Sequence, residues 1–178
     1  MSPYIQTYSG ECLALLAPDP AGILLQDVAH ALSHICRFTG HSKTFYSVAQ
    51  HSVLICEEAQ DRCMNETTQR WALLHDATEA YLGDVSSPLK GLLPGYSRLE
   101  AIWQRAVADR FFLPRVMPDV IHTLDREALI AEAETFLIGG PQGDGWPSGG
   151  SSILLGPPMC PDEAEAAFLR HADRLGVM

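Results

Sequence analysis

Apolar residues return every three or four positions along most of the chain, and this period predicts a mostly helical protein. In the first such segment Val28, Leu32 and Ile35 share one helix face. The third segment begins at Thr67 and Thr68, which are good N-caps. The expected helices cover residues 23–38, 47–59, 67–82, 97–112 and 118–137, and a short final helix covers 161–175.

Three segments depart from the helical period. Residues 4–8 alternate before the turn residues Ser9 and Gly10, which indicates a short hairpin or an extended arm. Pro and Gly recur between residues 88 and 95, which predicts a loop. Residues 138–161 are richer still in Gly and Pro and are about twice as long as an ordinary connection. They can form a linker, a lid, a subunit contact or a plain structural excursion.

The composition is that of a soluble globular protein, and we expect one domain over residues 1–178. No run of about 18 apolar residues indicates a membrane span, and the first ten residues lack the regions of a signal peptide. We therefore expect a cytoplasmic protein with no membrane partner. The formal charge of −10 argues against binding to a nucleic-acid polymer or an anionic membrane.

The five cysteines predict neither a disulfide framework nor a cysteine zinc cluster. Their number is odd, and no pair has the Cys-x-x-Cys spacing. The simplest expectation is that all five are reduced thiols of the core.

Residues 73–84 place ionisable groups inside an apolar helical pattern. Even a neutral polar group costs roughly 2 to 7 kcal/mol to bury without a partner, and a divalent cation would compensate the acids here. Because neighbours on a helix point about 100° apart, His75 and Asp76 can reach one ion only at a helix end or bend. Asp76 and Glu79 share one face. Gly83 suits a left-handed cap that ends the helix before Asp84.

His51 and Asp125 also interrupt apolar-facing stretches, on the second and fifth expected helices. With His75 and Asp76 they resemble the ordered set His, His-Asp, Asp of the HD-domain metal-dependent phosphohydrolases. The resemblance runs over residues 27–136 and implies an all-α HD-domain helical fold, preceded here by the hairpin or arm. It is closest to the small nucleotide-hydrolysing branch, which includes bacterial 5'-deoxynucleotidases and phage or antibiotic-pathway enzymes that act on deoxyadenosine-type triphosphates.

The resemblance implies a metal site with one divalent ion. Two imidazoles and two carboxylates suit manganese, cobalt, zinc, nickel or iron, of which we favour manganese or cobalt. Glu79 matches the acid that orients or deprotonates the attacking water, and Asp84 matches a polar catalytic residue near the sugar. The implied metal ligands are His51, His75, Asp76 and Asp125.

The resemblance also implies groups that bind substrate. Arg37 and Phe38 match an Arg-aromatic pair that meets phosphate and nucleoside, although Trp is often present where this chain has Phe38. Lys90 matches a phosphate-binding lysine in a Pro-x-Lys loop, and His41 is close enough to Arg37 to line the same pocket. His30 and His34 lack the Glu of a His-Glu-x-x-His motif, so we expect them to pack or join a polar network.

Each of these residues has a plain structural alternative, such as a surface charge, a helix cap or an ion pair. Their joint occurrence in order favours a nucleotide phosphohydrolase in a bacterial or phage-infected cell. The expected reaction converts a deoxynucleotide such as dATP to deoxynucleoside plus triphosphate. The alternatives are a 5'-deoxynucleotidase that releases orthophosphate, a non-catalytic nucleotide-binding module, and a helical interaction protein that uses residues 138–161. A homo-oligomer is implied by the resemblance only.

Overall fold

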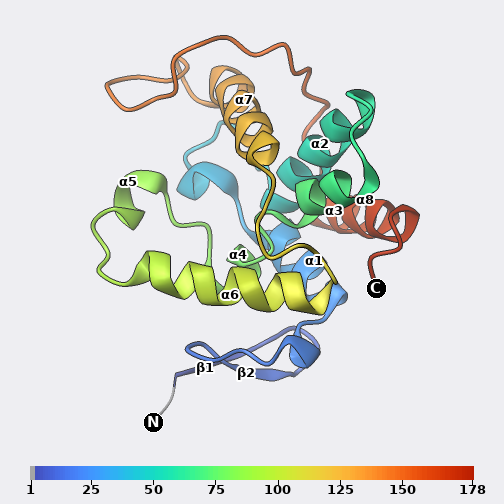
Figure 1. The fold of residues 1–178 in the computed structure, drawn as a ribbon. Helices are drawn as coiled ribbons and strands as arrows, with labels where there is room; N and C mark the ends of the chain where they lie inside the picture. Colours follow the sequence, from blue (N-terminus) through green and yellow to red (C-terminus); the bar gives the residue numbers. More distant parts are fainter. Residues whose placement is uncertain (1–2) are drawn as a thin grey trace.

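Helix α2 (Val48–Asp61) is the central element of residues 3–178, the part of the chain that the computed structural model describes. Ten of its 14 residues are buried. A helix buried on most of its surface needs neighbours on several sides, and α1, α3, α7 and α8 all pack against it (Figure 1). The other helices are α1 (Leu25–His34), α3 (Glu66–Leu74), α4 (Glu79–Leu82), α5 (Ser87–Lys90), α6 (Tyr96–Arg110), α7 (Asp119–Phe136) and α8 (Pro161–Arg174), with short 3-10 turns η1 (Pro20–Gly22) and η2 (Arg37–Gly40).

The predicted N-terminal hairpin is confirmed. Strands β1 (Tyr4–Gln6) and β2 (Cys12–Ala14) pair antiparallel beneath α6 (Figure 1). The buried carboxylate of Asp27 accepts hydrogen bonds from the Ser9 backbone N–H at 2.7 Å and from the Ser9 hydroxyl at 2.8 Å. The Trp103 indole donates to the backbone oxygen of Leu15 at 3.0 Å. These bonds attach the hairpin to α1 and α6.

The first predicted helix is shorter than its apolar pattern. Helix α1 ends at His34, because Ile35 has extended backbone angles (φ −86°, ψ 117°). Phe38 and Thr39 then take positive φ values of 55° and 54° inside η2. This turn places Arg37 in the interior instead of on a continuing helix face.

The predicted helix over residues 67–82 is two helices. Helix α3 ends at Leu74, and a turn separates it from α4. The expectation of one continuous helix is therefore wrong, and the break provides the helix end that His75 and Asp76 need in order to reach one ion. The N-cap is Asn65, whose side chain accepts from the Thr68 N–H at 2.9 Å, and not Thr67 or Thr68. Gly83 ends α4 with a φ of 78°, but its ψ of 158° is extended and not left-handed helical.

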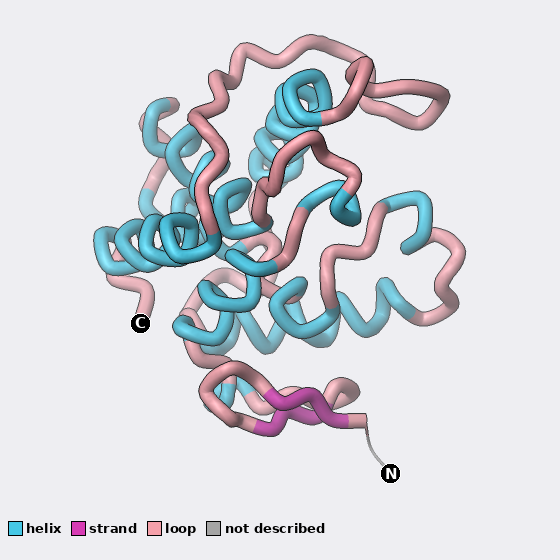
Figure 2. The backbone as a smooth tube through the Cα atoms, turned by 180° about the vertical axis from the view of Figure 1, so that it is seen from behind, coloured by secondary structure: helices cyan, strands magenta, loops and turns pink. Residues whose placement is uncertain are grey.

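The later elements match the sequence closely. Helices α6, α7 and α8 begin and end within two residues of the predicted limits. The predicted loop over residues 88–95 begins inside one short helix, α5. Residues 138–160 contain neither helix nor strand and cross one end of the molecule between α7 and α8 (Figure 2). The Gln50 side chain fastens this segment to α2, since it donates to Pro157 O at 2.8 Å and accepts from Met159 N at 2.9 Å.

The prediction that all five cysteines are core thiols is wrong. Each is a free thiol, but only Cys56 is buried, and Cys12, Cys63 and Cys160 are exposed. The latter three lie on the hairpin, after α2 and at the start of α8.

None of the helices in residues 3–178 has both the length and the apolar character that crossing a membrane requires.

Candidate metal centre

Three side chains from separate parts of the chain meet at the edge of the core, where His51 and His75 are buried and Asp125 is half-buried. His51 comes from the first turn of α2, His75 from the residue after α3, and Asp125 from α7. The Nε2 atom of His51 lies 3.3 Å from His75 Nε2 and 3.1 Å from Asp125 Oδ1. One donor atom from each lies within 4.8 Å of the others. Two imidazole nitrogens and a carboxylate oxygen this close can hold a metal ion.

Asp76 adds a second carboxylate to this group. Its Oδ2 atom lies 3.2 Å from His75 Nε2 and 3.7 Å from His51 Nε2. This is possible because α3 has ended, so the consecutive residues His75 and Asp76 do not diverge as they would on a helix. Burial opposes the charge of Asp76, but His75, His51 and Arg37 outweigh it and hold the pKa of Asp76 far below its usual range. We call His51, His75, Asp76 and Asp125 the buried cluster.

Glu132 supports the buried cluster from behind. The Nδ1 atom of His51 lies 2.7 Å from Glu132 Oε1, and both residues have no exposed surface. In a neutral imidazole, a proton on Nδ1 that is donated to Glu132 leaves Nε2 unprotonated and facing the other three residues of the buried cluster. The sequence reasoning missed Glu132. Its position in the sequence could have identified it. Glu132 follows Asp125 by seven residues, which is two helical turns along the same face, and it lies within an apolar run.

Arg37 links Glu132 to the buried cluster. Its Nε donates to Glu132 Oε2 at 3.0 Å, and its Nη1 lies 3.8 Å from Asp76 Oδ2. Burial would lower the pKa of Arg37, but the carboxylates of Glu132, Asp125 and Asp76 raise it above its ordinary value. In the same way burial would raise the pKa of Glu132, and Arg37 and His51 lower it below its ordinary value. The pair is therefore ionised.

A cavity of about 640 Å³ opens beside the buried cluster. Two of its walls come from the turn after α1 and from the segment that runs through α4 and α5. A third wall comes from α7 and the long segment that follows it. All of the substrate and catalytic residues that the sequence analysis named line this one cavity, together with two of the predicted ligands: Arg37, Phe38, His41, Asp76, Glu79, Asp84, Lys90 and Asp125.

Glu79 is the acid of this cavity with unused hydrogen-bonding capacity. Its Oε2 atom is buried and has no hydrogen-bond partner among the described residues. Its Oε1 atom is 3.8 Å from Lys90 Nζ. Burial, followed by the negative charges of Asp76 and Asp84, raises the pKa of Glu79 well above its ordinary value. A carboxylate of raised basicity that faces a cavity is a stronger proton acceptor than an ordinary glutamate.

Lys90 has a partner that the sequence reasoning did not identify. Its Nζ atom lies 2.7 Å from Glu100 Oε1 on α6, which is closer than its distance to Glu79. Burial would lower the pKa of Lys90, but the hydrogen bond to Glu100 and the charge of Glu79 raise it. The lysine is thus charged at the cavity wall and held by Glu100.

Apolar side chains also line the cavity, and the long segment supplies part of them. Trp146 and Pro147 line the cavity together with Phe38 and Leu129. The Trp146 indole donates to the backbone oxygen of Gln142 at 3.0 Å, which fixes the ring against its own loop. Sequence reasoning considered this segment a linker, lid or contact surface and did not assign any of its residues to the site.

Comparison with known proteins finds two relatives from bacteria. The uncharacterized protein YfdR of Escherichia coli strain K12 is 38% identical over 144 residues, which cover 81% of this chain and 77% of that protein. An uncharacterized protein of Rhodobacter capsulatus is 42% identical over 116 residues, which cover 62% of this chain and 59% of that protein. No family model matches the chain.

Proposed function

The chain belongs to the same family as Escherichia coli YfdR, and we propose that it is a metal-dependent HD-domain phosphohydrolase that acts on deoxynucleotides. The proposed substrate is a deoxynucleoside triphosphate such as dATP, with deoxynucleoside and triphosphate as products. One observation carries the proposal. The buried cluster lies at the wall of a cavity that also holds a basic carboxylate, Glu79, and a guanidinium, Arg37.

The donor set fits a single divalent transition-metal ion. Two imidazoles and two carboxylates make a site of intermediate hardness, for which we favour manganese or cobalt. Such an ion polarises a phosphoryl oxygen and lowers the pKa of a bound water. Glu132 supports this fit, because it fixes the proton of His51 on Nδ1 and leaves Nε2 for a metal.

Glu79 accepts the proton of the attacking water in this proposal. The cavity brings its carboxylate together with Asp76 and Asp125. The raised pKa of Glu79 makes it a stronger base than an ordinary glutamate, and a positioned base typically contributes about 10²- to 10⁴-fold in rate. A protein that only bound nucleotides would have no use for this group, which argues against the non-catalytic alternative.

The phosphate chain is bound by the two cations of the cavity. Arg37 uses Nε for Glu132, and its remaining N–H groups are available to phosphoryl oxygens. Lys90 is a charged group at the cavity wall, and a phosphate oxygen there competes with Glu100 for it. Both cations stabilise the negative charge that develops on the phosphoryl oxygens.

The apolar wall receives the nucleoside. Phe38 and Trp146 offer aromatic faces, and stacking of a base on an aromatic ring contributes about 1 to 3 kcal/mol. In this proposal Asp84, which lines the same cavity, accepts a hydrogen bond from the sugar. A volume of about 640 Å³ lies within the usual range of roughly 300 to 1,000 Å³ for small-molecule sites. The long segment thus serves the cavity, which weakens the interaction-protein alternative.

Product analysis tests the proposal. Manganese- or cobalt-loaded protein is incubated separately with dATP and dAMP, and the products are separated by chromatography. Deoxyadenosine and intact triphosphate from dATP are the expected result, and Glu79→Gln protein loaded with the same metal is the control. Orthophosphate from dAMP with dATP untouched would assign a 5'-deoxynucleotidase instead. No hydrolysis of either by metal-loaded protein would contradict the proposal.

A further inference from the structure

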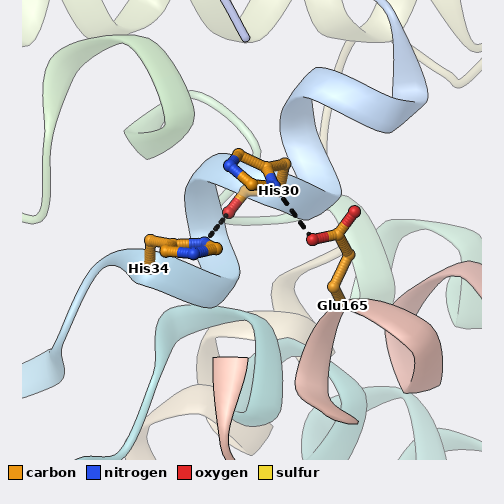
Figure 3. A group of neighbouring side chains, drawn as sticks. All are labelled: His30, His34 and Glu165. Atoms are coloured by element: carbon orange, nitrogen blue, oxygen red, sulfur yellow. Dashed lines mark hydrogen bonds and ion pairs between the residues drawn. The ribbon is translucent and has the colours of Figure 1, made fainter. Parts of the chain in front are cut away.

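A second group of metal-binding side chains lies away from the cavity. His30 and His34 are on α1, and Glu165 is on α8 (Figure 3). One nitrogen from each ring and one carboxylate oxygen lie within 4.8 Å of one another. We call these three residues the surface cluster. None of them lines the cavity or belongs to the buried cluster.

The surface cluster is assembled by helix geometry. Residues four apart on a helix are neighbours on one face, so His30 and His34 point to the same side of α1. Glu165 approaches from the facing helix, with its Oε2 atom 3.0 Å from His30 Nδ1. Since α1 and α8 pack against each other, folding alone brings the carboxylate to the histidine pair across 135 residues of sequence.

Both imidazoles are already oriented. The ring of Tyr8 stacks on His30 with the centroids 3.7 Å apart and the planes 15° apart. The Nδ1 atom of His34 lies 2.9 Å from the backbone oxygen of His30 (Figure 3). A metal-binding histidine usually makes such a bond with the ring nitrogen that does not bind the metal. The two histidine side chains therefore lose little further conformational entropy when an ion binds.

We propose that the surface cluster binds a transition-metal ion of the zinc type and thereby ties α1 to α8. Two imidazoles and one carboxylate match zinc, which often takes three protein ligands and completes its tetrahedron with water. The exposure of His34 leaves room for that water. Calcium and magnesium are excluded as the preferred ions because they bind mainly oxygen ligands. The proposal does not depend on the chemistry at the buried cluster.

An ion at this site would link two helices. An ion bound by both helices stabilises only the folded chain, because the unfolded chain does not hold His34 and Glu165 together. Helix α8 follows directly after the segment that carries Trp146. Zinc at the surface cluster therefore fastens the helix to which one end of the cavity wall is attached.

Zinc stoichiometry tests this proposal with variants that keep the fold. Wild-type protein, His34→Gln and His122→Gln are dialysed against Zn²⁺, and the bound metal is measured by elemental analysis. His34 and His122 are both exposed, and His122 lies on α7 outside the surface cluster, so the second variant is a matched control. Zinc held by the buried cluster or by exposed thiols is common to all three proteins.

The expected result is one zinc ion fewer per chain for His34→Gln than for wild type, and no difference for His122→Gln. Glu165→Gln should lower the affinity for this zinc ion by at least about tenfold. Removal of a residue that only hydrogen-bonds to a metal ligand already causes a loss of this size. Added Zn²⁺ should raise the melting temperature of wild type more than that of His34→Gln. Equal stoichiometry and an equal rise in wild type and His34→Gln would overturn the proposal.

Discussion

Glu132 and His51 form the closest side-chain contact around the buried cluster, with Glu132 Oε1 2.7 Å from His51 Nδ1. Neither side chain reaches solvent. The same glutamate accepts from Arg37 through its other oxygen. One carboxylate thus orients a proposed metal ligand and holds a proposed phosphate ligand, so the two functions share one support.

Replacement of Glu132 tests this shared support. In Glu132→Gln the neutral amide no longer balances Arg37, and loss of one partner of a buried pair costs about 3 to 5 kcal/mol of stability. Manganese affinity should fall by about 10- to 100-fold because His51 loses its orienting anion. Calorimetric titration with Mn²⁺ and thermal unfolding measure the two effects. Wild-type affinity in the variant would show that Glu132 has no part in metal binding.

Glu79→Gln separates metal binding from turnover. The amide is isosteric but cannot take a proton, so activity on dATP should fall by about 10²- to 10⁴-fold. Because Glu79 is not among the proposed ligands, the variant should bind manganese as wild type does, whereas Asp76→Asn should lose both properties. The measurement combines metal content with initial rates. Turnover equal to wild type would remove Glu79 from its assigned role.

The dependence of activity on pH follows from the same carboxylate. Burial and the charges of Asp76 and Asp84 raise the pKa of Glu79, and only the ionised form accepts a proton. Activity should therefore fall as pH decreases through this raised pKa, at a higher pH than for an ordinary glutamate. In Asp84→Asn one repelling charge is gone, so the acid limb of the kcat/KM profile should move to lower pH. An unmoved limb would contradict the assignment to Glu79.

Lys90→Ala tests phosphate capture. The half-buried ion pair with Glu100 contributes little to stability, about 1 kcal/mol or less, so the melting temperature should change only slightly. The KM for dATP should rise, because one of the two cations at the cavity wall is lost. Steady-state kinetics and thermal unfolding distinguish the outcomes. A large loss of stability with an unchanged KM would make Lys90 a structural residue.

Trp146→Ala tests the nucleoside wall. Loss of base stacking worth about 1 to 3 kcal/mol corresponds to a rise in KM of about 5- to 150-fold, and Trp146→Phe should recover much of it because it keeps an aromatic face. The exposed Leu154, which is in the same segment but does not line the cavity, gives a control in Leu154→Ala. If Trp146→Ala behaved like that control, the wall would not contact the base.

The helical periodicity of the sequence was sufficient to predict the number and rough limits of the long helices. Local patterns also identified the hairpin and the Gly- and Pro-rich segment. They failed where apolar spacing continues through a break, at Ile35 and at the turn after Leu74. Apolar spacing indicates which side chains face the core. It does not distinguish a continuing helix from a turn that directs the same side chains inward.

The sequence by itself determined which residues are candidates for chemistry, since ionisable groups inside apolar runs need a reason to be there. His51, His75, Asp76 and Asp125 were identified in this way together with the family resemblance. Only the tertiary structure decided that they meet, because they come from α2, from the turn after α3 and from α7, which are far apart along the chain. It also added partners that look ordinary in sequence. Packing is needed to recognise these partners, because each matters only beside the group that it contacts. They are Glu132, Glu100, Trp146 and Glu165.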